Sequence, residues 1–143
     1  MKACVVDASV AMKWILPPAN EPLVAEAIRL LDLHTCGQTQ FVVPDLFWVE
    51  CSNVLWKSTR LGRCSKADAL SGLAALKGYS IVTLPSVNLV EKAFTNSISF
   101  SCSVYDSLYV AIAVETGAPL ITADQKLVNT LAGFLPVKWL GAI

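Results

Sequence analysis

The sequence ACVVDAS at residues 3–9 places a carboxylate directly after a short apolar segment. Residues 3–6 are small or β-branched, which predicts a strand buried in a sheet. Residues 9–16 then predict a short helix, which ends before Pro17 and Pro18. Segments of these two kinds alternate along the whole chain. This order predicts a parallel sheet flanked by helices, an α/β sandwich.

The remaining elements are predicted from the same signals. Strands are expected at residues 41–43, 79–84, 120–122 and 137–140, and helices at 21–33, 45–60, 65–77, 88–95, 105–116 and 125–131. The helix at 65–77 opens on a segment that resembles a capping box, with Asp68 in place of the usual Glu or Gln. No linker, repeat or low-complexity tract interrupts the order. Residues 1–143 are therefore expected to form one domain.

The composition provides ample material for a core and excludes a disordered chain, because 55% of the residues are hydrophobic and only 15% are charged. The apolar surplus indicates a surface that a second copy or a partner covers. Eleven acidic residues balance eleven basic ones. Binding to nucleic acid by overall charge is therefore not expected, and a protein of this kind that handles RNA would need a local patch and metal ions.

The five cysteines are scattered and odd in number, with no C-x-x-C pair. This pattern disfavours both a disulfide framework and a zinc site, and most of the cysteines are expected to be small buried residues in a reducing compartment. No signal-peptide pattern follows Met1, and no run of about 18 apolar residues predicts a membrane span. We expect a cytoplasmic globular protein.

Three aspartates are expected at one edge of the sheet. Asp7 follows the first strand directly, Asp124 follows the strand at 120–122 by one residue, and Asp106 begins a helix that faces the same edge. Working sites of open α/β sheets lie at the carboxyl ends of the strands, near a reversal of strand order. Three acids that meet there repel one another, and a cation is needed to stabilise them.

Glu50 is a carboxylate within the mostly apolar run at residues 46–51. A buried ionised carboxylate costs several kcal/mol or more, so this side chain must be paired, protonated or bound to a metal. Asn53 lies one turn later on the same face and could hold the glutamate or a bound water.

Hard oxygen ligands without histidine or cysteine suit Mg²⁺ or Mn²⁺ rather than zinc. Such sites activate water and stabilise charge on a phosphoryl group, which indicates phosphodiester hydrolysis. The sole histidine, His34, lies at an expected helix end away from the acids and is a poor candidate for acid–base catalysis.

Four segments of the chain resemble the PIN-domain nucleases, and in particular the VapC-type toxins of bacterial and archaeal toxin–antitoxin pairs. The segments are VVDAS at residues 5–9, VPDLFWVECSN at 43–53, YDSLYVAIA at 105–113 and LITADQKL at 120–127. One segment alone would be weak evidence, whereas four in order cover nearly the whole chain.

The resemblance implies a PIN fold in which the four acids Asp7, Glu50, Asp106 and Asp124 hold Mg²⁺ or Mn²⁺. Ser9 and Thr122 match the small hydroxyl positions that support the first and last aspartates, and Asn53 matches the polar position after the glutamate. The resemblance also implies RNA cleavage, a cognate antitoxin that inserts a segment near the acidic pocket, and a homodimer. No acid of the pattern is missing.

Simpler explanations exist for each acid taken alone. Asp7 and Asp124 could cap the helices that follow them, and Asp106 could be a first-turn acid favoured by the helix dipole. Glu50 could pair with Lys57 or Arg60 about two turns away. The joint occurrence of the acids at the expected edge favours a shared metal site.

Several other residues have competing interpretations. The basic stretch Lys57, Arg60, Arg63 and Lys66 is either an ordinary solvated face, which is slightly favoured, or a contact for phosphate or the antitoxin. Trp14, Trp48, Trp56 and Trp139 are expected in the core or an interface, Tyr105 and Tyr109 as packing residues, and Asp45, Glu91 and Glu115 as surface or capping acids.

The sequence therefore predicts a metal-dependent endoribonuclease toxin. Two other functions fit part of this pattern. A phosphatase of the haloacid-dehalogenase type also begins with an aspartate after its first strand, but it requires a second acid where this chain has Ser9. A PIN-like module that binds RNA or a protein without cutting is the other, and the intact set of acids argues against it.

Overall fold

Five parallel strands form the central sheet of the computed structural model, which describes residues 1–143 apart from the side chain of Asn20. The strand order is β3-β2-β1-β4-β5, and every neighbouring pair is parallel. The strands are β1 (Lys2–Val6), β2 (Thr39–Pro44), β3 (Val82–Leu84), β4 (Leu120–Thr122) and β5 (Val137–Trp139). The predicted α/β sandwich is confirmed.

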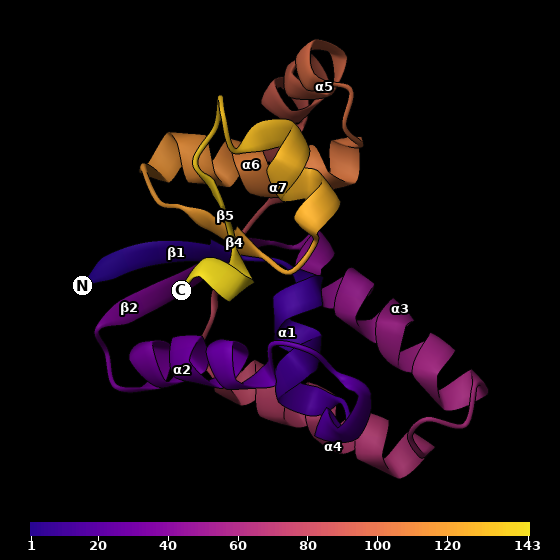
Figure 1. Cartoon of the computed structure of the whole chain (residues 1–143). Helices are drawn as coiled ribbons and strands as arrows, with labels where there is room; N and C mark the ends of the chain where they lie inside the picture. Colours follow the sequence, from indigo (N-terminus) through magenta and orange to yellow (C-terminus); the bar gives the residue numbers. More distant parts are fainter.

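Helices cover both faces of this sheet. Figure 1 shows α5, α6 and α7 on one side and α1, α2 and α4 on the other, with α3 projecting from the edge where α1 begins. The helices are α1 (Ala8–Ile15), α2 (Val24–Thr35), α3 (Leu46–Arg60), α4 (Lys66–Gly78), α5 (Val90–Phe100), α6 (Val104–Thr116) and α7 (Gln125–Leu131), with 3₁₀ turns at Pro18–Asn20, Ser86–Asn88 and Leu140–Ala142.

The core lies on both sides of the sheet, which explains why the strands are apolar without alternation. Val5, Val6, Phe41 and Val43 are completely buried. Residues 107–113 of α6 are buried on every side of the helix, because α6 lies between the sheet and α5. A helix buried in this way is apolar all round rather than amphipathic.

The strand boundaries differ from the sequence prediction by up to three residues, and the differences at Pro44 and before Val82 have clear local reasons. Pro44 is the last residue of β2 rather than its terminator, since a proline can occupy a strand end where its missing N–H is not needed. The strand predicted at 79–84 is shortened to Val82–Leu84. Tyr79 instead ends α4, and Ser80 adopts a left-handed φ of 56° that an extended strand does not allow.

Among the helices, the largest differences are at the start of α2 and at the end of α5. The helix predicted from residue 21 begins at Val24, after Leu23 in a left-handed conformation with φ 61°. The helix predicted at 88–95 runs on to Phe100, whose ring packs against the core. The predicted cap at Ser65 is confirmed, because its side chain accepts a hydrogen bond of 3.0 Å from the backbone N–H of Asp68.

The strand order places a reversal beside β1. From β1 the chain proceeds outward to β2 and β3 on one side, and later returns to β4 and β5 on the other. The carboxyl ends of β1 and β4 therefore flank the crevice where open α/β sheets bind ligands.

No single helix in the described chain is long and apolar enough to cross a membrane, and only the pair α5 and α6, bent by 110°, meets that test together.

Candidate active site

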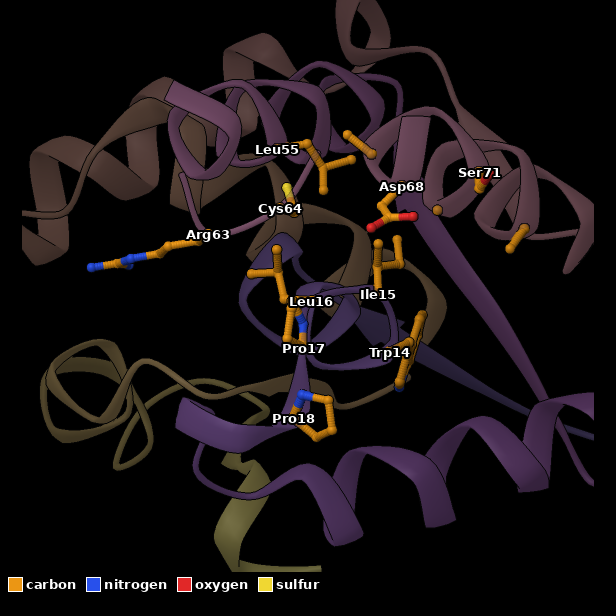
Figure 2. Close-up of a pocket in the computed structure, with 13 residues that line it drawn as sticks. Trp14, Ile15, Leu16, Pro17, Pro18, Leu55, Arg63, Cys64, Asp68 and Ser71 are labelled. Carbon is orange, nitrogen blue, oxygen red and sulfur yellow. The ribbon is translucent and has the colours of Figure 1, made fainter. Parts of the chain in front are cut away.

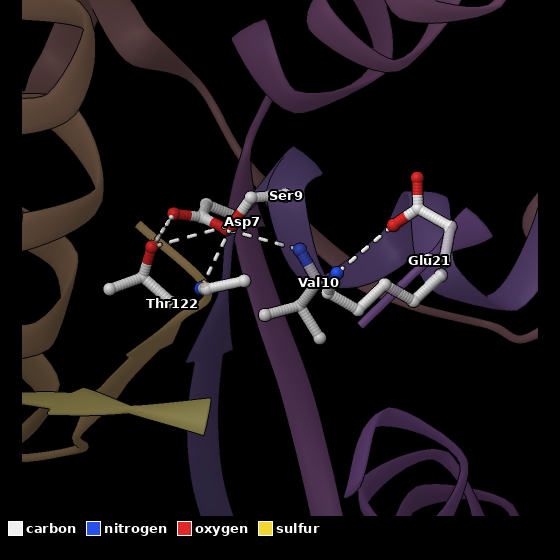
Figure 3. A network of polar contacts seen from close by, with 7 residues as sticks. Asp7, Ser9, Val10, Glu21 and Thr122 are labelled. Atoms are coloured by element: carbon white, nitrogen blue, oxygen red, sulfur yellow. Dashed lines mark hydrogen bonds and ion pairs between the residues drawn. The ribbon is translucent and has the colours of Figure 1, made fainter. Parts of the chain in front are cut away.

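Asp7 is the first residue after β1 and the N-cap of α1, and only 9% of it is exposed. Three donors point at its carboxylate (Figure 3). Ser9 Oγ donates to Oδ1 at 2.5 Å, Thr122 Oγ1 donates to Oδ2 at 2.5 Å, and the backbone N–H of Val10 donates to Oδ1 at 3.3 Å. The pKa of Asp7 is raised to about 6: burial raises it most, the three hydrogen bonds lower it, and the charge of Asp106 raises it.

Ser9 and Thr122 connect the first strand to the fourth. Ser9 Oγ accepts the backbone N–H of Ala123 at 3.0 Å, and Thr122 Oγ1 accepts the backbone N–H of Asp124 at 3.1 Å. Each hydroxyl thus both supports the Asp7 carboxylate and holds the turn that carries Asp124. Asp124 itself is exposed and caps α7 through a 3.2 Å bond from the N–H of Leu127. Asp7 and Asp124 therefore each cap a helix and also lie at the carboxyl edge of the sheet.

Asp106 is coupled electrostatically to the other three acids. It stands half-buried in the first turn of α6, where its backbone N–H donates to the N-cap side chain of Ser103 at 3.1 Å. Burial, followed by the charge of Asp124, raises the pKa of Asp106. The charge of Asp106 in turn raises the pKa of both Asp7 and Glu50. Asp106 is therefore within electrostatic reach of the other three acids.

Glu50 is held by Tyr109, which the sequence pattern did not single out as a site residue. The hydroxyl of Tyr109, which is only 2% exposed, donates to Glu50 Oε1 at 2.5 Å. Burial raises the pKa of Glu50, and the hydrogen bond from Tyr109 lowers it. Tyr109 was expected to be a packing residue. It is buried, but its hydroxyl also contacts the acidic cluster.

Among the described residues, no ion pair joins a lysine or arginine to any of these four acids. The ion pairs within the described residues are Lys13–Glu21, Arg29–Glu26 and Lys92–Glu115. The alternative in which Glu50 pairs with Lys57 or Arg60 is therefore wrong. Excess negative charge remains at the carboxyl edge of the sheet.

The polar residue one turn after Glu50 lies apart from it. Asn53 is exposed, and no hydrogen bond joins it to Glu50 in the part of the chain that the structure describes. The role that the sequence suggested for Asn53, of holding the glutamate or a bound water, stays a prediction.

The donor set fits a hard divalent cation. The site presents carboxylate and hydroxyl oxygens, which Mg²⁺ and Mn²⁺ prefer. Across residues 1–143, leaving aside the side chain of Asn20, no three acidic, histidine or cysteine side chains lie close enough to enclose an ion directly as they stand. Mg²⁺ keeps several waters and takes only one or two carboxylates directly, so a wider acidic ring suits it.

Two cavities lie near these elements. An open cleft of about 270 Å³ borders Asp106 and Asp124, with Ser103 and Lys126 also in its wall. A larger cavity of about 480 Å³ lies between the end of α1 and the helices α3 and α4 (Figure 2). Its walls are mainly apolar, and Arg63 and Asp68 are the charged residues among those that line it.

The ring nitrogens of His34 bond to backbone groups away from the four acids, as expected. Its Nε2 lies 2.6 Å from the carbonyl oxygen of Tyr79, and its Nδ1 accepts the backbone N–H of Phe41 at 3.1 Å. Both ring nitrogens are therefore used by the backbone. The expectation that most cysteines are buried is wrong, since only Cys4 and Cys51 are; all five are free thiols in this structure.

The layered fold and its edge of unpaired acids define an α/β protein with a carboxylate site at the switch point of the sheet. The chain belongs to the PIN domain family, whose model matches residues 4–131. The similarity to VapC-type proteins is also confirmed. The chain is 29% identical over 126 residues to ribonuclease VapC3 of Pyrobaculum aerophilum, covering 86% of this chain and 90% of that protein. It is 29% identical over 133 residues to ribonuclease VapC9 of Mycobacterium tuberculosis, covering 93% and 94%.

Solved structures share the fold. PAE2754 from Pyrobaculum aerophilum superposes with a TM-score of 0.71 at 22% identity, over 99% of this chain and 85% of that one. VapBC2 from Rickettsia felis, solved with a DNA fragment from its promoter, gives a TM-score of 0.66 at 13% identity, over 96% and 98% of the two chains. At these identities the likeness concerns the fold alone.

Proposed function

We propose that this protein is a Mg²⁺- or Mn²⁺-dependent endoribonuclease and the toxin of a type II toxin–antitoxin pair. The observation that carries the proposal is the group of four acids, Asp7, Glu50, Asp106 and Asp124, which interact around Asp106 without a neutralising cation. The relatives named as VapC ribonucleases support the reaction class.

Asp7, Asp106 and Asp124 would hold the metal. When bound, a divalent cation of this kind polarises phosphoryl oxygens and lowers the pKa of water. Ser9 and Thr122 fix the Asp7 carboxylate in one orientation and keep it ionised, because both donate to its oxygens. The two hydroxyls, of which that of Thr122 is completely buried, therefore orient the carboxylate before any ligand arrives.

Glu50 would orient the attacking water and accept its proton. The hydroxyl of Tyr109 occupies Glu50 Oε1, and no protein donor among the described residues is bonded to Oε2. The second oxygen is therefore free to face the substrate. A general base must lie within hydrogen-bond reach of the proton that it takes, and Tyr109 limits the positions that Glu50 can adopt.

The antitoxin partner is supported by structural neighbours such as VapBC2 and a toxin–antitoxin complex from Klebsiella pneumoniae. We assign its apolar segment to the cavity of Figure 2, where Leu16 and Pro17 at the end of α1 face Leu55 of α3. Arg63 at its rim has no ion pair in the described chain and suits an acidic residue of the partner. Arg63→Glu is expected to weaken the complex, and unchanged affinity would contradict this assignment.

A homodimer is supported by the surface of α5. Val90, Phe94 and Ile98 recur every four residues and are all exposed, so they form an apolar row that water disfavours. Light scattering is expected to give twice the chain mass, and Phe94→Glu is expected to give monomers. A monomeric wild-type protein would reject the dimer.

The direct test is cleavage of single-stranded and structured RNA with Mg²⁺ or Mn²⁺. We expect cleavage that EDTA abolishes and that Asp7→Asn removes, with a cooperative unfolding transition retained. The matched control is Asp32→Asn, an exposed acid outside the site. RNA binding without cleavage would identify a binding module instead, and full cleavage in excess EDTA would reject the metal.

A further inference from the structure

Helix α3 presents a row of exposed polar, aromatic and basic side chains that begins one turn after Glu50. The row, called here the α3 stripe, consists of Asn53, Trp56, Lys57 and Arg60, all exposed. The opposite face of the helix is buried through Phe47, Cys51, Leu55 and Ser58. Successive members are three or four residues apart or adjacent, so they lie along one side of the helix.

Trp56 is unusual for a tryptophan in this chain. It is 54% exposed, although it was expected in the core or an interface. The guanidinium carbon of Arg60 lies 4.8 Å from the centre of its ring, a cation–π arrangement. The pair presents a flat aromatic surface together with a positive charge, which is the combination that binds a base and its phosphate in single-stranded nucleic acid.

The charges of the stripe are available to a ligand. Lys57 and Arg60 make no ion pair with any described acid, and α3 carries no acidic residue after Glu50. Arg63 and Lys66 follow in the turn to α4 and extend the positive end. Backbone phosphates complement this unpaired positive charge, and they supply most of the affinity of sequence-independent binding.

The stripe is continuous with the acidic site. Lys57 lies seven residues after Glu50, which is two helical turns or about 10 Å along the axis. It therefore stands on the same side of α3 as the glutamate. Figure 1 shows α3 projecting from the edge of the molecule at the carboxyl ends of the strands. A strand that leaves the acids along α3 meets Asn53, then the Trp56–Arg60 pair.

We propose that the α3 stripe is the path of single-stranded RNA beyond the cleavage site, with a base stacked on Trp56 and phosphates on Lys57 and Arg60. This inference rests on the proposed function, because it assigns a path to the substrate of the same site. Asn53 then faces the RNA rather than Glu50. Within the basic stretch that the sequence left open, Lys57 and Arg60 are thereby assigned to the substrate, whereas Arg63 lines the cavity assigned to the antitoxin.

The test measures affinity for a short fluorescent single-stranded RNA with Mg²⁺, in an Asp7→Asn background that prevents cutting. Trp56→Ala is expected to weaken binding by about fivefold or more, the effect of one lost stacked base. The double variant Lys57→Gln and Arg60→Gln is expected to reduce the slope of log affinity against log salt by about 1.4, since each lost phosphate contact contributes about 0.7.

Two control variants match these changes. Lys2→Gln removes an exposed cation at the opposite end of β1, and Phe134→Ala removes an exposed aromatic ring. Both are expected to bind as the parent does. Stripe variants that bind RNA as tightly as these controls in the Asp7→Asn background would overturn this inference without affecting the proposed function. Stripe variants that change the oligomeric state but keep the parent's RNA affinity would identify the α3 stripe as a contact between copies of the chain. This result would also overturn the inference.

Cleavage by the wild-type protein separates this inference from the proposed function. If the wild-type protein cuts no RNA with Mg²⁺ or Mn²⁺, the proposed function fails and the path fails with it. If the wild type cuts and only the stripe variants lose affinity and rate, both stand. Thermal unfolding of each variant is expected to be unchanged, because the substituted side chains are exposed.

Discussion

The hydroxyl of Tyr109 donates a 2.5 Å hydrogen bond to Glu50 Oε1 across 59 positions of sequence. It joins α6, which carries Asp106, to α3, which carries Glu50. The bond is partly buried, and burial together with Glu50 raises the pKa of Tyr109, so the tyrosine stays a proton donor. The hydrogen bond thus fixes the position of Glu50 relative to α6, the helix that carries Asp106.

Tyr109→Phe removes only this hydroxyl. We expect kcat for RNA cleavage to fall by about tenfold or more while KM changes little, because Glu50 keeps its charge but loses its position. Stability is expected to fall by about 1 kcal/mol, as for one lost hydrogen bond. Single-turnover kinetics and urea unfolding measure the two effects.

The matched control for that variant is Tyr105→Phe, which lies one helical turn earlier and is 63% exposed. It is expected to cut RNA at the wild-type rate. Equal losses in the two variants would show that the Tyr109 hydroxyl has no specific role.

Thr122 is completely buried and uses its hydroxyl twice, as donor to Asp7 and as acceptor from the Asp124 N–H. Thr122→Val keeps the shape but removes the hydroxyl. Loss of a donor to the carboxylate raises the pKa of Asp7 further, so the pH of half-maximal cleavage is expected to move upward. Thr122→Ser, which retains the hydroxyl, is expected to keep the wild-type profile, and identical profiles for Val and Ser would reject the role.

Metal-free protein is expected to lose stability as the pH rises from about 4 to about 6. The pKa of Asp7 is raised from 3.8 to about 6 in the folded state, chiefly by burial. In that interval the folded state binds more protons than the unfolded state, so the free energy of unfolding falls, by about 3 kcal/mol at most. The raised pKa values of Glu50 and Asp106 act in the same direction.

Urea unfolding in EDTA at pH 5 and at pH 7.5 measures this effect. Asp7→Asn is expected to make the free energy of unfolding less dependent on pH and to raise it at pH 7.5. Asp32→Asn is expected to leave the pH dependence and the stability at pH 7.5 unchanged. Higher stability of the wild-type protein at pH 7.5 than at pH 5 would contradict the raised pKa.

Helices α1 and α4 approach closely at Gly72. A Cβ at this position would lie 2.2 Å from Ile15 Cγ2, so Gly72→Ala forces the two helices or the isoleucine to shift. Overpacking of this kind costs about 1–3 kcal/mol. Gly78→Ala at the end of α4 is the control, since nothing lies within 4 Å of its Cβ. The midpoints of unfolding of the two variants are compared. Equal stabilities would show that α1 and α4 accommodate the added methyl group without loss of stability.

Most of the fold could be predicted from the sequence because each strand is a short apolar run followed by a break or a carboxylate. The errors occur where tertiary contacts decide the boundary. Residues 79–81 look like strand, yet Tyr79 ends α4 and Ser80 turns the chain. The last turn of α5 depends on packing of Phe100, which local sequence does not reveal.

The three candidate aspartates could be placed at one edge of the sheet because their positions follow from the order of the strands, and Glu50 could be selected because it is a carboxylate within an apolar run. The partners could not. Tyr109 lies in an apolar run that local sequence explains by packing alone, and the acceptor of its hydroxyl is 59 residues away. Exposure of Trp56 was missed for a related reason, since a tryptophan beside apolar neighbours resembles a core residue until the helix is oriented.

The central claim is that Asp106 and its three neighbours form one site for a divalent cation. Titration of the protein with Mn²⁺, followed by the electron paramagnetic resonance signal of the free ion, tests it without any substrate. We predict saturable binding by the wild-type protein and a loss of affinity of tenfold or more in Asp106→Asn, with Asp32→Asn unchanged. No saturable binding, or equal binding by the Asp106 and Asp32 variants, would contradict the account.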